Sequence, residues 1–267
     1  MVHKEKLEKL YSVLRGYESA AVAFSAGVDS TFLLKAARDV LKERCIALTA
    51  DSPSFPEAER KAAYEFCREN GIKQIVFEPG ELDNENYAAN PKDRCYYCKH
   101  IIFGKMLELA KDEGISEVLE GSNADDETDY RPGMRAVSEL GIKSPLKEAG
   151  LTKSEIRELS REMGLKTWDK PSFACLASRI PYGDRITREK LVMAGKAEAL
   201  LFELGFTNCR VRMHGKVARI ELLTSEFEKM LDPSVREKVT AGFKELGFDY
   251  TAMDLKGYRT GSLNEVL

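Results

Sequence analysis

Short apolar runs alternate with amphipathic segments over the first two thirds of the chain. The apolar runs lack helical periodicity, which is typical of strands buried on both faces of a sheet; they lie at 20–24, 45–50, 72–77 and 117–120. Segments with apolar residues at helical spacing lie at 4–14, 31–41, 56–69, 101–113 and 152–163. Strands that alternate with helices predict an α/β fold, with a mostly parallel sheet covered on both faces.

The pattern changes near residue 186. We expect a long helix over 187–204, and then two short strands, 209–213 and 217–222, joined at His214-Gly215 as a hairpin. Helices over 226–231 and 234–246 and a strand near 250–255 follow. This arrangement predicts two domains, a large one over residues 1–185 and a small α+β one over residues 186–267.

The turn between the first strand and the next helix is rich in small and hydroxyl residues, SAGVDS at 25–30. Such a turn leaves backbone N–H groups free at the positive end of the helix dipole, and this arrangement suits phosphate. An ordinary strand–turn–helix with serine caps would have the same pattern, and the lysine of a Walker loop is absent. The series resembles the PP-loop of ATP pyrophosphatases. That family usually has glycine where Ala26 stands, and because alanine disfavours positive φ, we expect an ordinary backbone angle there.

Polar loops follow the other strands, and ligands of parallel sheets bind at these strand ends. Ser25, Gly27, Asp29 and Ser30 would hold the pyrophosphate part of ATP, with Asp29 capping the helix and orienting the loop, since an anion repels phosphate. Asp51 and Ser52 would lie by the adenosine. In the loop from Gly121 to Asp129, the candidates for Mg²⁺ or ribose contacts are Asn123, Asp125 and Asp126, unless they only form an Asx-rich turn.

Composition and charge limit the compartment and the partners. Lysine and arginine number 41 against 44 acidic residues, without a basic arm, so we expect no nucleic-acid or membrane surface. The first residues lack the apolar core of a signal peptide, and no run has transmembrane length. We therefore expect a cytoplasmic protein, in which the six cysteines are not a disulfide framework.

Three cysteines are candidates for a metal centre. Cys95 and Cys98 form a Cys-x-x-Cys pair, whereas Cys175 lies far along the chain; Cys45, Cys67 and Cys209 are interpreted as packing residues. Zinc would need a fourth ligand, and a thioredoxin-like pair would open a helix, whereas this one follows a long polar loop. Three thiolates suit a 4Fe–4S cluster with one iron free of protein ligands, with zinc or no metal as the alternatives.

Several charged residues in the last third could bind substrate. Arg179 could hold a carboxylate or phosphate. Arg210 and Arg212 alternate on one predicted strand and would share a face, as a phosphate clamp or as part of a salt-bridged sheet surface. Glu198 falls in an apolar helical stripe and therefore needs a metal or an arginine as its partner. Trp168 is expected to pack in the core, with stacking on an aromatic ring of the substrate as the alternative.

Four segments together resemble the LarE family, the ATP-dependent sulfur transferases that prepare the nickel-pincer cofactor of lactate racemase. They are SAGVDS at 25–30, GSNADD at 121–126, CLASR at 175–179 and RVRMHG at 210–215. The resemblance implies a PP-loop fold of the adenine nucleotide alpha hydrolase type with a five-stranded sheet. It further implies adenylation by ATP and Mg²⁺ of a carboxylate of pyridinium-3,5-biscarboxylic acid mononucleotide, which a sulfur nucleophile then converts to a thiocarboxylate.

The resemblance also implies roles for individual residues. In single-cysteine members the residue matching Cys175 gives up its sulfur, whereas Cys95 and Cys98 place this chain with the three-cysteine subtype, in which a 4Fe–4S cluster is thought to carry sulfur. Glu198 and the acidic position near Glu226 match a secondary metal site, and a ring-like homo-oligomer is implied. Alternatives are a PP-loop tRNA thiolase, an amidotransferase-type synthetase and a non-catalytic nucleotide- or metal-binding module.

Overall fold

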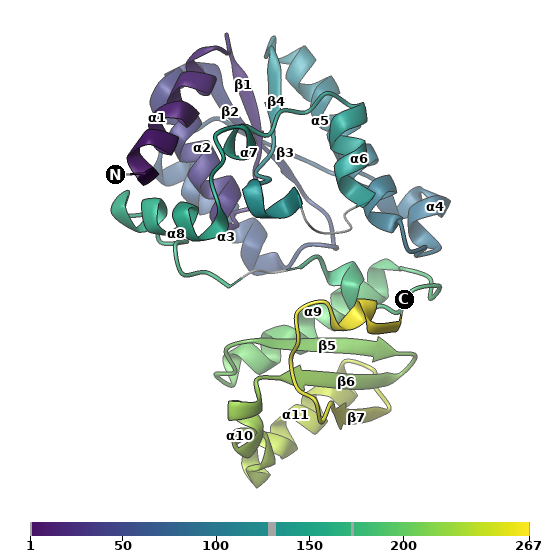
Figure 1. The fold of residues 1–267 in the computed structure, drawn as a ribbon. Helices are drawn as coiled ribbons and strands as arrows, with labels where there is room; N and C mark the ends of the chain where they lie inside the picture. The colour runs from purple at the N-terminus through teal and green to yellow at the C-terminus, as the bar shows by residue number, and fades with distance from the viewer. Residues whose placement is uncertain (1, 128–131, 172–173, 267) are drawn as a thin grey trace. The chain divides into compact units, whose positions relative to one another are not determined.

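The computed structural model describes residues 2–127, 132–171 and 174–266 (Figure 1). Its described residues pack into two compact units. The first unit is formed within 1–52, 57–81 and 93–173, and the second within 53–56, 82–92 and 174–267. The second unit therefore takes two short segments from the first third of the chain. The division of roles between residues 1–185 and 186–267 stays a prediction.

A parallel sheet forms the centre of the first unit. Its strands are β1 (Ala20–Ala23), β2 (Cys45–Ala50), β3 (Gln74–Phe77) and β4 (Glu117–Leu119), in the order β3-β2-β1-β4. Ala20 pairs in register with Cys45 on one side and with Glu117 on the other. Among the described residues this sheet thus has four strands instead of the expected five, and Lys143 extends it beyond β4 only as a single bridge to Leu119.

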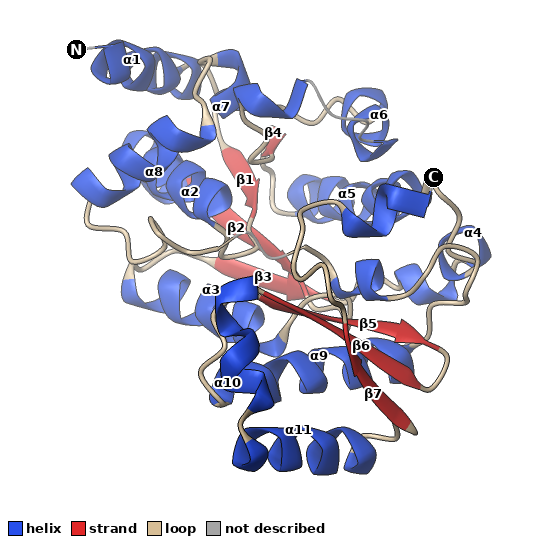
Figure 2. Ribbon diagram, turned by 60° about the horizontal axis from the view of Figure 1, so that its bottom comes forward, coloured by secondary structure: helices blue, strands red, loops and turns tan. Residues whose placement is uncertain are grey.

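Helices cover both faces of this sheet. The α-helices described in the first unit are α1 (Val2–Arg15), α2 (Val28–Leu41), α3 (Glu57–Glu69), α5 (Arg94–Asp112), α6 (Pro132–Glu139), α7 (Pro145–Glu148) and α8 (Lys153–Glu162). One apolar core joins residues of α1, α2, α3, α7 and α8 to β1 and β2. The α5–α6 pair lies on the other side of the sheet (Figures 1 and 2). The apolar stripes of these helices bury the sheet, which explains why its two central strands are apolar except for Thr49, whose hydroxyl donates to the Phe24 carbonyl.

The helix boundaries follow the local sequence signals with one large exception. Thr152 forms the expected capping box with Glu155 at the start of α8. By contrast, α5 begins at Arg94, seven residues before the predicted start, so the Cys-x-x-Cys pair lies inside a helix. Polar and aromatic side chains occupy this first turn and a half, which hides the apolar periodicity, although no helix breaker lies within it.

The second unit is a small α+β structure, as the sequence predicted. Its elements are α4 (Glu85–Ala88), α9 (Arg188–Glu203), β5 (Cys209–His214), β6 (Val217–Leu222), α10 (Phe227–Leu231), α11 (Pro233–Glu245) and β7 (Tyr250–Met253). β5 and β6 form the expected antiparallel hairpin, whose turn includes Gly215 at φ +59°, and β7 joins β6 in parallel. The side chain of Thr187 caps α9, also as expected.

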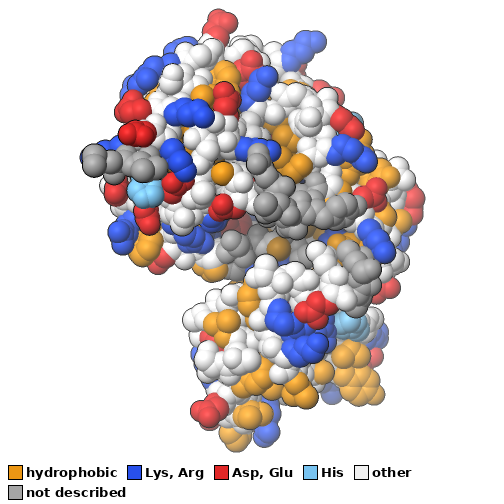
Figure 3. Space-filling model, viewed as in Figure 1, with side chains coloured by type: hydrophobic (Ala, Val, Ile, Leu, Met, Phe, Trp, Pro, Cys, Tyr) orange, Lys and Arg blue, Asp and Glu red, His pale blue; other side chains and the backbone are white. Residues whose placement is uncertain are grey.

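Charged side chains of both signs are interspersed on the face that Figure 3 shows. Among the described residues, no helix combines the length and the apolar character that crossing a membrane requires.

Candidate functional site

The order of the strands places a ligand site at the carboxyl ends of β1 and β4. From β1 the chain moves outward to β2 and β3, and it then returns to the other side of β1 to form β4. Adjacent loops therefore diverge at this point, which is the topological switch where parallel sheets bind ligands. The loop Ser25–Ser30 follows β1, and Gly121 and Ser122 follow β4.

Hydroxyl groups hold the loop Ser25–Ser30 closed on itself. The Ser30 Oγ lies 3.1 Å from the Ser25 Oγ, accepts from the Ser25 N–H at 3.3 Å and donates to the Gly27 carbonyl at 3.3 Å. Gly27 is the N-cap of α2 without a side-chain cap of its own. The first N–H groups of α2 have no partner within the helix and are available to an anion.

Ala26 contradicts the expected ordinary backbone angle, because its φ is +55°. Ala26 thus adopts the left-handed conformation, although its Cβ atom disfavours it. Only 2% of Ala26 is exposed, and it packs into the apolar core beside α2. Its small methyl group fills core space, so packing helps to hold the angle that glycine would adopt by itself.

Gly121 brings the end of β4 directly against this loop. A Cβ atom added at Gly121 would lie 3.2 Å from the Ser30 nitrogen and 3.3 Å from the Asp29 Cβ. These separations are tighter than nine in ten real Cβ contacts, so a side chain at position 121 would force the loop to shift by a few tenths of an ångström. Gly121 therefore shapes the site by letting the two strand ends approach each other.

Asp29 lies in the first turn of α2, paired with a lysine that sequence reasoning missed. The Asp29 Oδ2 accepts from the Lys153 Nζ, and the Lys153 N–H donates to Asp125 at 2.8 Å. The Asp29 Oδ1 is buried without a hydrogen-bond partner among the described residues. A carboxylate oxygen in this state fits a hard divalent cation, so Asp29 could help to hold Mg²⁺ beside bound phosphates. Lys153 also offsets the repulsion between Asp29 and an anion.

The remaining strand-end candidates are engaged within the first unit. Asp51 pairs with Arg60, and the buried Ser52 hydroxyl donates to Glu81. The Asn123 side chain accepts from the Asp125 N–H, while the Asp126 carboxylate accepts from the Asn123 N–H, both at 3.0 Å. This is the Asx-rich turn that the sequence left open as an alternative. The end of the predicted loop, 128–131, lies outside the described residues.

The six cysteines fall into two groups, and none forms a disulfide. Burial raises the pKa values of the Cys45 and Cys67 thiols to about 12 and raises that of Cys209 still further, which agrees with packing roles. Cys95 is exposed and Cys98 is half-buried on α5, one turn apart, so their thiols fit two corners of a thiolate-bound cluster. Cys175 is half-buried and belongs to the second unit.

Arg179 and Glu198 form a bidentate ion pair in the second unit. Arg179 is fully buried and Glu198 is 3% exposed, with N–O distances of 2.7 and 2.9 Å. The Arg179 Nη1 also donates to the Ser178 hydroxyl and to the backbone carbonyl of Ala174, next to Cys175. These contacts favour a positioning role for Arg179 over the predicted contact with substrate.

The two arginines of β5 are also buried. Arg212 binds the buried Glu221 through two N–H groups, both at 3.1 Å, and donates to the Ser178 carbonyl at 2.7 Å. Burial, followed by the charge of Arg179, lowers the pKa of the Arg210 guanidinium. Glu198 acts on this pKa in the opposite direction, since its negative charge lies near both Arg179 and Arg210.

The secondary metal site at Glu198 and Glu226 stays a prediction. Glu198 has an arginine as its partner, and its Oε1 also accepts from the Val211 N–H at 2.9 Å, so it is committed without a metal. The Glu226 Oε1 accepts from Thr207, whereas its Oε2 is buried without a described partner. Within the described part of either unit, no three histidine, cysteine or carboxylate side chains are gathered for an ion.

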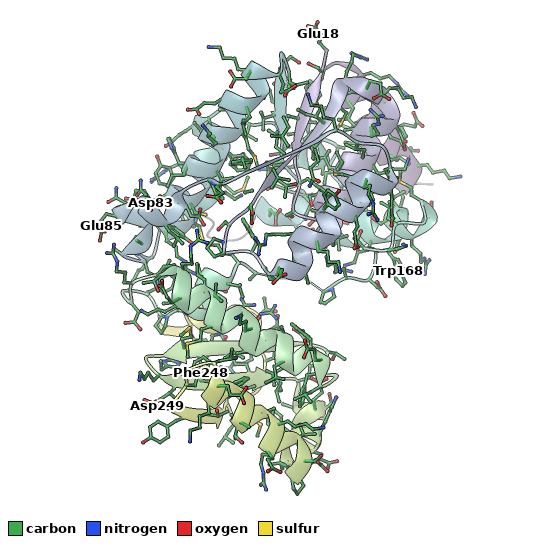
Figure 4. All side chains as sticks on the ribbon, turned by 180° about the vertical axis from the view of Figure 1, so that it is seen from behind. Glu18, Asp83, Glu85, Trp168, Phe248 and Asp249 are labelled. Atoms are coloured by element: carbon green, nitrogen blue, oxygen red, sulfur yellow. The ribbon has the colours of Figure 1, made fainter. Side chains whose placement is uncertain are left out.

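Trp168 does not pack in the core as expected. It is 39% exposed on the first unit, where Figure 4 labels it, and the Arg161 guanidinium lies 5.7 Å from its ring centroid. Arg161 belongs to α8, and its guanidinium lies over the Trp168 ring, where core side chains were expected to pack.

Sequence comparison supports what the fold and the loop indicate. No family model matches the chain. An uncharacterised protein of Synechocystis sp. is 41% identical over 264 residues, 99% of this chain and 98% of that protein. The pyridinium-3,5-bisthiocarboxylic acid mononucleotide synthase of Lactiplantibacillus plantarum is 35% identical over 263 residues, 98% of this chain and 95% of that enzyme. An argininosuccinate synthase of Pyrococcus furiosus is 26% identical over 166 residues, 56% of this chain and 40% of that enzyme.

The parallel sheet with Ser25–Ser30 at its switch point, together with these relatives, defines an ATP-using enzyme of the PP-loop class. Within that class, the chain belongs to the LarE family, which includes the pyridinium-3,5-bisthiocarboxylic acid mononucleotide synthase of L. plantarum, as the four sequence segments predicted.

Proposed function

We propose that the protein is an ATP-dependent sulfur transferase that converts a carboxylate of pyridinium-3,5-biscarboxylic acid mononucleotide to a thiocarboxylate. The observation that carries the proposal is full-length similarity to a synthase named for the bisthiocarboxylic product, combined with the loop at the end of β1. A carboxylate does not exchange oxygen for sulfur without activation. A loop suited to hold pyrophosphate would support an activation step in which ATP releases pyrophosphate.

The proposed activation is an adenylation. A carboxylate oxygen of the substrate attacks the α-phosphorus of ATP, and the bond to the β-phosphate oxygen breaks, so pyrophosphate leaves. Ser25, Gly27 and Ser30 would hold the departing pyrophosphate through hydroxyl and backbone N–H groups. Mg²⁺, held in part by Asp29, would neutralise its negative charge. A sulfur nucleophile then adds to the acyl carbon, and the carbon–oxygen bond to AMP breaks.

The cysteines are proposed to provide the sulfur. Cys95, Cys98 and Cys175 would hold a 4Fe–4S cluster, because thiolates are the ligands that such clusters take. When it is bound, the cluster would supply the sulfide. The protein's own contribution is to orient Cys175, whose neighbouring carbonyl accepts a hydrogen bond from Arg179. Arg210 and Arg212 are candidates for binding the phosphate of the substrate, since both are positively charged side chains of β5.

The test is an incubation with ATP, Mg²⁺ and the biscarboxylate mononucleotide, followed by nucleotide analysis. We expect AMP and pyrophosphate in equal amounts, formed only when the mononucleotide is present, and a slower reaction with Ser30→Ala. The conversion of ATP to ADP and phosphate would contradict the proposal, and turnover that requires tRNA would favour the tRNA thiolase. A Lys166→Met variant, altered at an exposed residue away from the loop contacts, serves as the control.

A further inference from the structure

The loop Ser25–Ser30 contains a non-glycine residue in the left-handed region, and one charged side chain bonds to that residue's carbonyl. Ala26 has φ +55°, and the Lys170 Nζ donates to the Ala26 carbonyl at 3.0 Å. Lys170 lies 144 residues further along the chain, in the same unit. A conformation that costs free energy persists only where surrounding contacts enforce it. The hydrogen bond from Lys170 to the Ala26 carbonyl is such a contact.

Lys170 is itself held in place. Its Nζ also donates to the Glu59 Oε2 of α3 at 2.8 Å, and the two side chains are only 21% and 15% exposed. At this burial an ion pair is less screened than at the surface, and a hydrogen bond from a charged donor is stronger than a neutral one. Glu59 therefore fixes the ammonium group, which in turn fixes the Ala26 carbonyl.

An ordinary surface ion pair would explain the contact with Glu59 but not the second bond. The carbonyl that Lys170 binds belongs to the residue of the loop with a disfavoured φ, and Gly27, directly after it, begins the N-terminus of α2. Rotation of the peptide between these two residues would move the N–H group of Gly27. The shape of the anion-binding turn thus depends on where the Ala26 carbonyl points.

We propose that Lys170 is a positioning residue that holds Ala26 in its left-handed conformation and thereby keeps the loop in the form that binds a nucleotide's pyrophosphate group. A glycine at position 26 would adopt this conformation without help. The proposal rests on the proposed function as far as the ligand is concerned, whereas the coupling between positions 26 and 170 is independent of it.

The experiment is a double-mutant cycle on the full chain, with binding of inorganic pyrophosphate and Mg²⁺ measured by calorimetry. We expect Lys170→Met to weaken binding about tenfold, which corresponds to about 1.4 kcal/mol. In the Ala26→Gly background, the same substitution should weaken binding by less than about threefold, because glycine needs no external support. Lys170→Arg, which keeps a charged donor, should largely preserve binding.

Two control variants separate this role from bulk electrostatics. Lys166→Met removes an exposed positive charge of the same unit and should leave affinity unchanged. Glu59→Gln keeps a partner for Lys170 and should weaken binding less than Lys170→Met does. If Lys170→Met costs the same factor in both backgrounds, the proposal is overturned, and Lys170 acts on the ligand by its charge alone.

A failure of the proposed function gives a different result. If the parent protein does not bind pyrophosphate, the four proteins of the cycle (the parent, Lys170→Met, Ala26→Gly and the double variant) are compared by thermal unfolding. Lys170→Met should then lower the midpoint more in the parent than in the Ala26→Gly background. Equal shifts would refute the positioning role independently of any ligand.

Discussion

At the scale of single residues, the Arg179–Glu198 pair shows how a buried ion pair can serve a neighbouring segment. Both side chains are removed from water, which is expensive for charges, and each finds its donors or acceptors within the second unit. The Arg179 Nη1 group also donates hydrogen bonds to the Ser178 hydroxyl and to the Ala174 carbonyl. The pair therefore orders the backbone on both sides of Cys175.

Breaking this pair should destabilise the protein strongly. Glu198→Gln leaves the Arg179 charge buried and uncompensated, and we expect a loss of about 3 kcal/mol or more in the free energy of unfolding. Urea denaturation measures the loss. The matched control is Glu85→Gln, which removes the partner of Arg185 at the exposed edge where Figure 4 labels Glu85, and it should cause no measurable change. Similar losses in the two variants would contradict the importance of burial.

We expect the stability of the protein to depend on pH because of His214, the last residue of β5. His214 lies at the exposed end of β5, where partial desolvation of its ring, followed by the charge of Arg219, lowers its pKa below the ordinary value of 6.5. The unfolded chain consequently binds a proton more readily than the folded one, so stability is lost as the pH falls through 6.5 towards the lowered pKa. Melting temperatures recorded between about pH 8 and about pH 5 should show this loss, with a smaller loss in His214→Gln. An unchanged profile in that variant would exclude His214 as the source.

At the scale of elements, helix α5 determines how two of the three candidate cluster ligands are presented. Residues three apart on a helix share a face, so the thiols of Cys95 and Cys98 lie on the same side of the first turns. A rigid element fixes their spacing before any metal binds, and this is what a preformed site requires.

Iron content tests this assignment. In anaerobically purified protein, Cys95→Ala, Cys98→Ala and Cys175→Ala should each abolish bound iron and acid-labile sulfide, because each removes a thiolate ligand. Cys67→Ala, which alters a buried thiol of α3, should retain both, and Ser30→Ala should retain iron while slowing adenylation. Full iron in all three of the first variants would mean that the ligands are elsewhere.

Elements were predictable where local chemistry and burial agree. The apolar runs at β1 and β2, the capping box of Thr152 and the hairpin at Gly215 all carry signals within a few residues. The start of α5 carries no such signal, because polar and aromatic side chains occupy its first turns. The contacts of Lys153 and Lys170 with the loop join residues more than 120 positions apart, and no local pattern reveals such pairs. Ala26 was misjudged because local propensity was weighed without the packing that overrides it.

At the scale of the whole molecule, the mass of the protein after turnover distinguishes the two sources of sulfur. If sulfide arrives from a cluster or from solution, the polypeptide keeps its mass. If Cys175 gives up its own sulfur, the chain becomes lighter by one hydrogen sulfide as dehydroalanine forms. We expect an unchanged mass by intact-protein mass spectrometry, because Cys95 and Cys98 accompany Cys175 in this chain. The predicted homo-oligomer stays a prediction.

The second unit is assembled from three separated stretches of chain, and its core contains parts of all three. The Asn90 side chain, fully buried, donates to the carbonyls of Ile180, Pro181 and Asp184, and the Tyr87 hydroxyl meets that of Ser54. A gene fragment that begins at residue 174 would therefore encode an incomplete body with unsatisfied carbonyls in its interior. During synthesis on the ribosome, the Asn90 side chain must wait for 90 to 94 later residues before its carbonyl partners emerge.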